Sequence, residues 1–162
     1  MQRQIVKKPI MVQAADLLAR QEHSSAKLKE KLRRRGYEES DIDTAIEKLI
    51  KARYLNDEDA CRRAFEYFYN AKRLSVRSIL QKLQQRGFSR ELANSFVPED
   101  ISEHELEAAV NSLQRKYRSS VPTEKMQQFL YMHGFSGGIR RQAIEQFAEE
   151  LQTELEKENG FE

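Results

Sequence analysis

The stretch "EKLRRRGYEE", residues 30–39, places a glycine and a tyrosine directly after a short amphipathic segment. The same pattern returns as "QKLQQRGFSR" at 81–90 and as "QFLYMHGFSG" at 128–137. The three glycines, Gly36, Gly87 and Gly134, are 51 and then 47 residues apart. A glycine just beyond a helix supplies the left-handed backbone that ends it, and the next aromatic ring folds onto the last turn. The pattern therefore predicts three equivalent helix ends and an internal repeat.

The segment before each glycine carries two apolar residues four positions apart, which places both on one face of a helix. The pairs are Leu28 and Leu32, Ile79 and Leu83, and Met126 and Leu130. The expected first positions of these helices are also equivalent: Ser24, Ser75 and Pro122. A serine hydroxyl there accepts an unpaired backbone N–H, and proline is compatible with a helix start.

Each of these central helices is flanked by two further amphipathic segments. We expect helices before them at 11–21, 58–71 and 103–117, and helices after them around 42–50, 92–96 and 144–155. Capping boxes at Ser40–Asp43 and Ser102–Glu105 are expected to open two of the nine. No stretch alternates as a strand does. The sequence thus predicts an all-α fold, an elongated array of three tandem three-helix repeats over 10–55, 56–101 and 102–158, the last with an acidic C-terminal helix.

Composition narrows the class of protein. The 162 residues are 33% charged, which suits helices with large exposed faces, and the one cysteine, Cys61, excludes an internal disulfide. No apolar run approaches the roughly 20 residues of a membrane helix, and the start lacks a secretory signal. We therefore expect a cytoplasmic protein without a membrane partner.

The formal charge of +2 conceals a division along the chain. Residues 1–97 hold 21 Lys and Arg against 13 Asp and Glu, whereas residues 98–162 hold 7 against 13. The resulting charges of +8 and −6 fit a polyanionic partner at the basic end. An ordinary solvated helix surface explains the same numbers, so charge alone leaves both interpretations open.

The chain resembles the RecX family of regulatory proteins. "LLARQEHSSAKLKEKLRRRGYEESDIDTAIEKLIKARYLND", residues 17–57, is similar to the family's first repeat, most clearly in Arg20-x-x-His23-Ser24 and in the Arg-Gly-aromatic ending. "EKMQQFLYMHGFSGGIRRQAI", residues 124–144, looks like the third repeat. The resemblance extends from Ala14 to about Phe147.

This resemblance implies a modulator of the RecA recombinase, lying in the groove of the recombinase–DNA filament and inhibiting its ATPase and strand-exchange activities. It implies no chemistry of the protein's own. The chain departs from the family in the second repeat, where Lys72, Arg73, Leu74 and Ser75 replace a Gly-x-Gly-Pro run. We expect a Ser75 cap in place of the rigid turn. His133 also occupies a position where arginine is common in the family.

The repeats differ on one flank of the central helix. In the first copy the flank is basic, with Lys27, Lys31 and Arg34, while Lys29 and Arg33 fall on the other side. The matching positions of the second copy are Ser78, Lys82 and Gln85, and those of the third are Lys125, Phe129 and Met132. The basic flank fits DNA phosphates or an acidic protein face, or else is solvated surface. Phe129 and Met132 either pack under the C-terminal helix or form a protein-contact patch.

Further candidates for contact with DNA or a protein partner lie beside this flank and in the second repeat. Tyr67 projects away from the expected core residues Phe65 and Phe68, where its ring could meet a base, a partner surface or only solvent. The other candidates are basic: Arg33, Arg35, Arg63, Lys72, Arg73, Arg77, Lys82 and Arg86.

The residues that enzymes use are scattered. His23, His104, His133 and Cys61 have no metal-ligand spacing, and Cys61 shares a helix face with expected core residues. "GFSGG", residues 134–138, lacks the lysine of a nucleotide loop and is interpreted as a flexible joint. We therefore expect no enzyme, no cofactor and no metal site, and a monomer that binds a recombinase filament and DNA. The alternative is a stand-alone helical-repeat module that binds nucleic acid.

Overall fold

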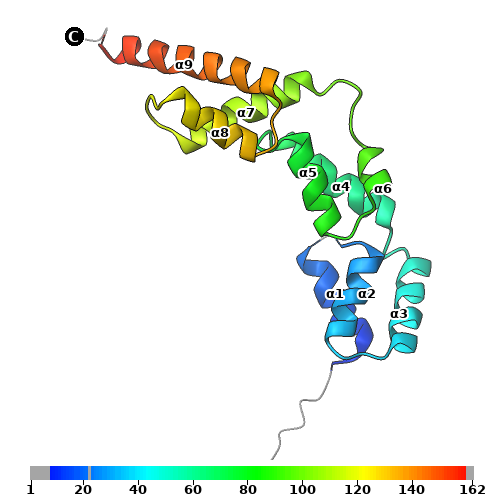
Figure 1. The fold of residues 1–162 in the computed structure, drawn as a ribbon. Helices are drawn as coiled ribbons and strands as arrows, with labels where there is room; N and C mark the ends of the chain where they lie inside the picture. The colour runs from blue at the N-terminus through cyan, green and yellow to red at the C-terminus, as the bar shows by residue number, and fades with distance from the viewer. Residues whose placement is uncertain (1–7, 22, 160–162) are drawn as a thin grey trace, which may run out of the picture. The chain divides into compact units, whose positions relative to one another are not determined.

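The computed structural model describes residues 8–21 and 23–159, and within them it contains nine α-helices and no strand (Figure 1). The predicted all-α fold is confirmed. The helices are α1 (Ile10–Arg20), α2 (Ser25–Arg34), α3 (Glu39–Lys51), α4 (Asp57–Asn70), α5 (Val76–Gln85), α6 (Arg90–Asn94), α7 (Ser102–Lys116), α8 (Thr123–Met132) and α9 (Gly137–Asn159).

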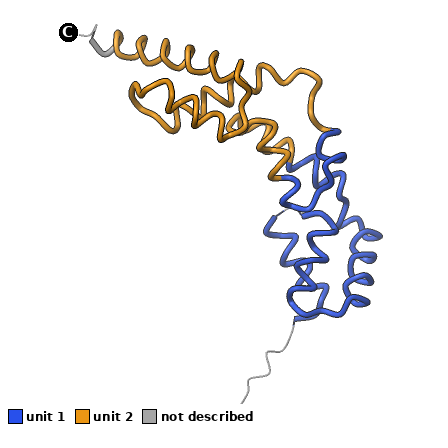
Figure 2. The backbone as a smooth tube through the Cα atoms, in the orientation of Figure 1, with its two compact units in different colours: residues 1–64, 83–95 blue, residues 65–82, 96–162 orange. Residues whose placement is uncertain are grey.

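The backbone divides into two compact units (Figure 2). Unit 1 comprises residues 1–64 and 83–95, and unit 2 comprises residues 65–82 and 96–162. The chain passes between the units at three points: inside α4, inside α5, and just after α6. The repeat boundaries drawn from the sequence therefore remain a prediction.

The three glycines end their helices as predicted. Gly36, Gly87 and Gly134 have φ values of 77°, 88° and 84°. In each case the glycine N–H donates to the carbonyl three residues earlier, and the following aromatic N–H donates to the carbonyl five residues earlier. These paired bonds are the Schellman ending of a helix, which satisfies carbonyls that would otherwise lack partners.

The serine caps are confirmed as well. The Oγ of Ser24 accepts the N–H of Lys27 at 3.0 Å, and the Oγ of Ser75 accepts the N–H of Ser78 at 3.2 Å. Pro122 precedes α8, as expected.

Both predicted capping boxes are wrong. Helix α3 begins at Glu39, before Ser40, and α7 is preceded by Ile101 without a side-chain cap. The carboxylate of Glu105 instead accepts the N–H of Val76 at 2.6 Å, 29 residues away. A capping box assumes a partner three residues away, whereas here the partner is the start of another helix.

Unit 1 shows what the recurring glycine does. The N–H of Ser24 donates to the carbonyl of Arg86 at 3.3 Å, so the start of α2 lies against the end of α5. A Cβ on Gly87 would stand 2.3 Å from the Ser24 hydroxyl, closer than any real Cβ contact. The next residue, Ser25, donates from its N–H and its hydroxyl to the two carboxylate oxygens of Asp57, at 2.7 and 2.8 Å.

Unit 2 repeats the arrangement one repeat later. The hydroxyl of Ser75 donates to the carbonyl of His133 at 2.7 Å, and a Cβ on Gly134 would lie 2.9 Å from that hydroxyl. Glu105 accepts from Val76 as Asp57 accepts from Ser25. Each junction thus joins the capping serine of one central helix to the glycine end of the next. At Gly87 and Gly134 the glycine therefore both ends its helix and admits this serine.

The segment 72–74, where the chain departs from the family that it resembles, is held by α7. Three successive carbonyls, those of Lys72, Arg73 and Leu74, contact Asn111 Nδ2 at 2.9 Å, Ser112 Oγ at 3.2 Å and His104 Nε2 at 3.0 Å. Lys72 has a left-handed φ of 50°, a conformation that a side chain disfavours. The bonds from α7 therefore fix a turn that contains no glycine.

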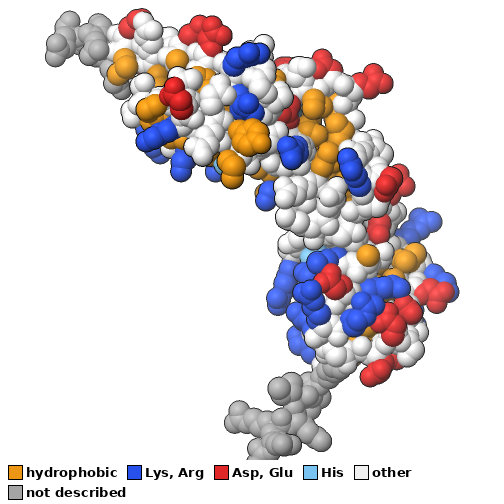
Figure 3. Space-filling model, in the orientation of Figure 1, with side chains coloured by type: hydrophobic (Ala, Val, Ile, Leu, Met, Phe, Trp, Pro, Cys, Tyr) orange, Lys and Arg blue, Asp and Glu red, His pale blue; other side chains and the backbone are white. Residues whose placement is uncertain are grey.

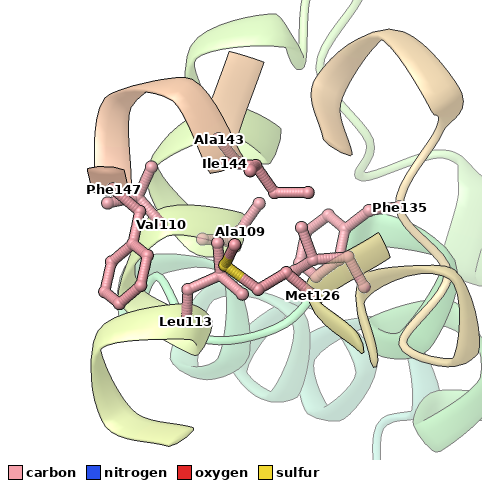
Figure 4. Packing of buried hydrophobic residues seen from close by; sticks show 10 residues of the cluster. Ala109, Val110, Leu113, Met126, Phe135, Ala143, Ile144 and Phe147 are labelled. Carbon is pink, nitrogen blue, oxygen red and sulfur yellow. The ribbon is translucent and has the colours of Figure 1, made fainter. Parts of the chain in front are cut away.

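The core of unit 2 is formed by α7, α8 and α9 together with Phe135. In Figure 4 the side chains of Leu113, Met126 and Phe147 turn toward one another from the three helices. In unit 1, Leu28 and Leu32 of α2 pack with residues of α1 and α3 in a second core. All six apolar residues predicted at the central-helix faces are buried.

Some predictions of burial are wrong. Phe129 packs against the core of unit 2, but Met132 is 74% exposed and does not pack under α9. Phe68 is half-buried rather than core. Gly137 and Gly138 form the first turn of α9 rather than a flexible joint.

Candidate nucleic-acid interface

Most cations on α2 are neutralised by carboxylates. On the flank proposed for binding, Lys27 and Arg34 both pair with Glu30, at 2.7 and 2.5 Å. On the opposite flank, Lys29 pairs with Asp43 at 2.6 Å. Arg33 donates two bonds to Glu39 at 2.9 and 2.7 Å, and this contact lowers the pKa of the Glu39 carboxyl. These four side chains therefore present less net charge than their sequence suggests.

The exception is Lys31, which lies in a groove of about 380 Å³ between α1 and α2. The groove is also lined by Arg20, His23, Arg34 and Arg35. Among the described residues, no carboxylate forms an ion pair with Arg20, Lys31 or Arg35. On the face of unit 1 seen in Figure 3, Lys and Arg side chains gather over these two helices.

The ammonium of Lys31 is oriented by a buried histidine. Its Nζ lies 3.0 Å from Nε2 of His23, whose side chain is 3% exposed. Because an ammonium can only donate, this nitrogen of the ring must accept, and the ring in this contact is neutral. Burial lowers the pKa of Lys31, and the charges of Lys27 and Arg35 lower it further. The carboxylate of Glu30 opposes the shift, and the repulsion from Lys27 and Arg35 is the part that a bound anion would relieve.

Sequence reasoning missed two residues of this groove as site residues. Arg20 ends α1 and His23 precedes α2, so both reach the groove through the connection between these helices. The Arg20-x-x-His23 spacing is the sequence feature that could have indicated them, but on its own it indicates only a helix junction. Of the predicted candidates, the groove brings together Lys31, Arg34 and Arg35, whereas Lys27 and Arg33 do not line it.

The remaining candidates are divided between the two units. Arg63 and Arg86 belong to unit 1, and the carbonyl of Arg86 takes part in the junction with Ser24. The others lie in unit 2: Tyr67, Lys72, Arg73, Arg77 and Lys82.

Within unit 2, some of these candidate side chains already contact other residues, and others are exposed. Lys72 pairs with Glu107 at 2.7 Å, and the Lys82 ammonium lies 5.9 Å from the centre of the Phe68 ring. Arg73 and Arg77 are exposed, and Tyr67 is 70% exposed. Lys72 is thus engaged in an ion pair, while Lys82, Arg73, Arg77 and Tyr67 are exposed to solvent.

A further surface of unit 2 is apolar. At the end of α8, Tyr131 is 64% exposed, beside the exposed Met132. The Arg140 guanidinium lies 5.3 Å from the centre of the Tyr131 ring and donates to Gln127 Oε1 and to the carbonyl of Phe135, both at 3.0 Å. Hydrophobic side chains lie among Lys and Arg on the visible face of this unit (Figure 3). Tyrosine, methionine and arginine are the residues enriched at the centres of protein interfaces.

The cysteine thiol and the histidine rings are buried in the fold or in contact with other parts of it. Burial raises the pKa of the Cys61 thiol to about 11, so the thiol stays protonated at neutral pH. His104 stacks on Tyr69 with ring centres 3.9 Å apart, and burial lowers its pKa. His133 contacts the carbonyl of Phe129 through Nδ1 at 2.7 Å.

The described part of the chain contains neither a metal-ligand cluster nor a helix that could span a membrane. Across residues 8–21 and 23–159, no three His, Cys, Asp or Glu side chains are grouped as metal ligands. None of the helices found there has the length and apolar character needed to span a bilayer.

Comparison with known proteins points to one family. The family model described as the first three-helix domain of RecX matches residues 11–49. The chain is 34% identical over 134 residues to Regulatory protein RecX of Ectopseudomonas mendocina (strain ymp), a match covering 76% of this chain and 84% of that protein. It is 31% identical over 124 residues to Regulatory protein RecX of Caldanaerobacter subterraneus subsp. tengcongensis, covering 74% of this chain but 60% of that longer relative.

The fold is shared with a solved structure. RecX from Lactobacillus salivarius superimposes with a TM-score of 0.65 and 21% identity, over 86% of this chain and 94% of that chain. The all-helical architecture predicted from the repeats is therefore found in a crystal structure.

Proposed function

Because the chain belongs to the RecX family of regulatory proteins, we propose that it binds RecA-type recombinase filaments and lowers their ATPase and strand-exchange activities. It does so in the cytoplasm, as a monomer, during recombination and DNA repair. The observation that carries the proposal is the relationship to proteins named as regulators across most of the chain. Two surfaces support the proposal because each could contact a partner: the basic groove of unit 1 and the exposed end of α8.

Two surfaces suit the two components of a recombinase–DNA filament. The groove of unit 1 presents Arg20, Lys31 and Arg35 without carboxylate partners, which suits the phosphates of a DNA strand. The end of α8 in unit 2 presents Tyr131 and Met132, which suit a protein surface. In this proposal DNA contacts position the protein, and the protein contact supplies specificity for the recombinase.

The alternative function is a stand-alone nucleic-acid-binding module, favoured by the same basic groove. The two functions differ in what the effect requires. A regulator needs the recombinase and acts at amounts far below one molecule per recombinase subunit. A module that only coats DNA needs enough protein to cover the strand and shields the DNA from any enzyme.

The α8 surface gives a direct test of the protein contact. We expect the double substitution Tyr131→Ser and Met132→Ser to weaken inhibition of the recombinase ATPase by about tenfold or more in the concentration required, since truncating central interface residues costs about 1–2 kcal/mol each. Affinity for DNA alone should not change. The free energy of unfolding should change by less than about 1 kcal/mol, because both side chains are exposed and only the surface contact of Arg140 with Tyr131 is lost.

The matched control uses exposed residues of the neighbouring helix, Gln142→Ser and Gln146→Ser, which lie in the same unit. The control should inhibit as the unmodified protein does. If the Tyr131 and Met132 double variant inhibited the ATPase as strongly as this control, the α8 surface would not contact the recombinase.

A further inference from the structure

The groove between α1 and α2 collects more cations than carboxylates: Asp16 and Glu30 act on it from a distance, but neither forms an ion pair with Arg20, Lys31 or Arg35. Arg34 has a carboxylate partner in Glu30, but Arg20, Lys31 and Arg35 have none among the described residues. On the rest of α2 every cation is paired. Like charges that converge on one space repel one another, and an anion placed between them relieves that repulsion.

The groove is also built to hold the central cation in place. The stem of Lys31 is half-buried, and its ammonium is oriented by the buried ring of His23 at 3.0 Å. The two flexible arginines stand at the rim, where both are exposed. A fixed ammonium with guanidinium groups around it matches a tetrahedral phosphate, which accepts charge-assisted hydrogen bonds from several directions.

We propose that Arg20, Lys31 and Arg35 form a phosphate-binding site, with His23 as the residue that positions Lys31. The site deepens the proposed function and rests on it for the identity of the ligand as a phosphodiester of a DNA strand. A free nucleotide carries the same phosphate chemistry and is the other possible source. The residues that the sequence favoured on this flank, Lys27 and Arg34, are secondary because both are engaged in ion pairs with Glu30, which reduces their combined charge from +2 to +1.

The test measures binding by the purified protein without any recombinase, so its outcome does not depend on regulation. A fluorescent oligo(dT) strand and a fluorescent ATP analogue are titrated separately at several salt concentrations. The substitutions Arg20→Gln, Lys31→Gln and Arg35→Gln are combined in one variant. We expect this variant to bind the strand about 10- to 100-fold more weakly at low salt. Its slope of log affinity against log salt should be shallower by about 2, or about 0.7 for each lost contact.

The control removes three cations of unit 1 that are paired with carboxylates: Lys29→Gln, Arg33→Gln and Lys51→Gln. It changes net charge by the same amount and should retain most of the affinity and the slope. A second variant, Arg20→Lys, Lys31→Arg and Arg35→Lys, keeps the charge and should regain part of the binding. Thermal unfolding of each variant shows whether it is folded.

The outcomes separate the ligands. Loss of strand binding in the Gln variant, with no effect on the ATP analogue, supports a DNA phosphate. Binding of the ATP analogue that is lost in the same variant supports the site but assigns it to a nucleotide. Equal weakening in the Gln variant and the control, or strand binding and salt slope unchanged in the folded Gln variant, overturns the site.

Discussion

Replacing Gly87 with alanine is expected to lower the free energy of unfolding by about 2–3 kcal/mol. The left-handed φ of 88° disfavours any side chain, by about 1–2 kcal/mol. The new Cβ would also stand 2.3 Å from the Ser24 hydroxyl and 2.9 Å from Lys27 Cβ. Ser24 must then move and lose its cap on α2, which is worth about 1 kcal/mol. Chemical denaturation followed by circular dichroism measures the change.

The chain offers graded controls for this prediction. At Gly134 the nearest atom to an added Cβ is the Ser75 hydroxyl at 2.9 Å, so Gly134→Ala should destabilise less than Gly87→Ala. At Gly138, inside α9, nothing lies within 4 Å, and alanine should be neutral or stabilising by up to about 1 kcal/mol. Equal denaturation midpoints for all three variants would contradict the junction between capping serine and glycine.

The second large effect concerns the buried carboxyl of Glu105. Glu105→Ala should lower the free energy of unfolding by about 1–3 kcal/mol, because the N–H of Val76 then loses its acceptor in a buried position. Glu105→Gln keeps an acceptor oxygen and removes the charge. At pH 7 this second variant should be at least as stable as the unmodified protein.

The direction of the pKa shift of Glu105 determines how the stability of the protein changes with pH. Burial raises the pKa of Glu105 above the ordinary glutamate value of 4.5, although the bond from Val76 opposes the shift. The folded protein therefore binds this proton more tightly than the unfolded chain. The resulting stabilisation is complete below pH 4.5 and is lost as the pH rises through the folded pKa.

We therefore expect the stability of Glu105→Gln, relative to the unmodified protein, to increase from about pH 4.5 to 7. His104 contributes with the opposite sign, since burial lowers its pKa, but it is present in both proteins and cancels in the difference. Glu103→Gln, at an exposed position of the same helix turn, is the matched control. Parallel stability curves for Glu105→Gln and the unmodified protein would show that the buried carboxyl does not titrate abnormally.

The features that depend on near neighbours in sequence could be predicted. The three glycine ends, the serine caps and the buried pairs such as Leu28 with Leu32 all follow from residues within one turn or two of one another. The pairing of Glu30 with Lys27 and Arg34 could also have been inferred, because these residues are three and four positions apart on a helix.

What the sequence did not reveal depends on contacts between distant residues. The capping boxes were misassigned because Glu105 reaches Val76 and Asp57 reaches Ser25, and local spacing carries no sign of either contact. Lys29 and Asp43 are likewise 14 residues apart. Arg20 joins the groove only through the path of the chain between α1 and α2. The groove therefore includes residues that the sequence did not indicate, although helix α2, which carries Lys31, was predicted.

The most direct test of the proposed regulation is the ATPase activity of the cognate recombinase on single-stranded DNA, with this protein titrated in. The account predicts that ATP hydrolysis falls at amounts far below one molecule per recombinase subunit. A DNA-dependent ATPase from another class, assayed on the same DNA and with the same amounts, should be unaffected. Inhibition that begins only when the protein covers the strand, and that affects both enzymes alike, would contradict filament regulation and support the stand-alone DNA-binding module.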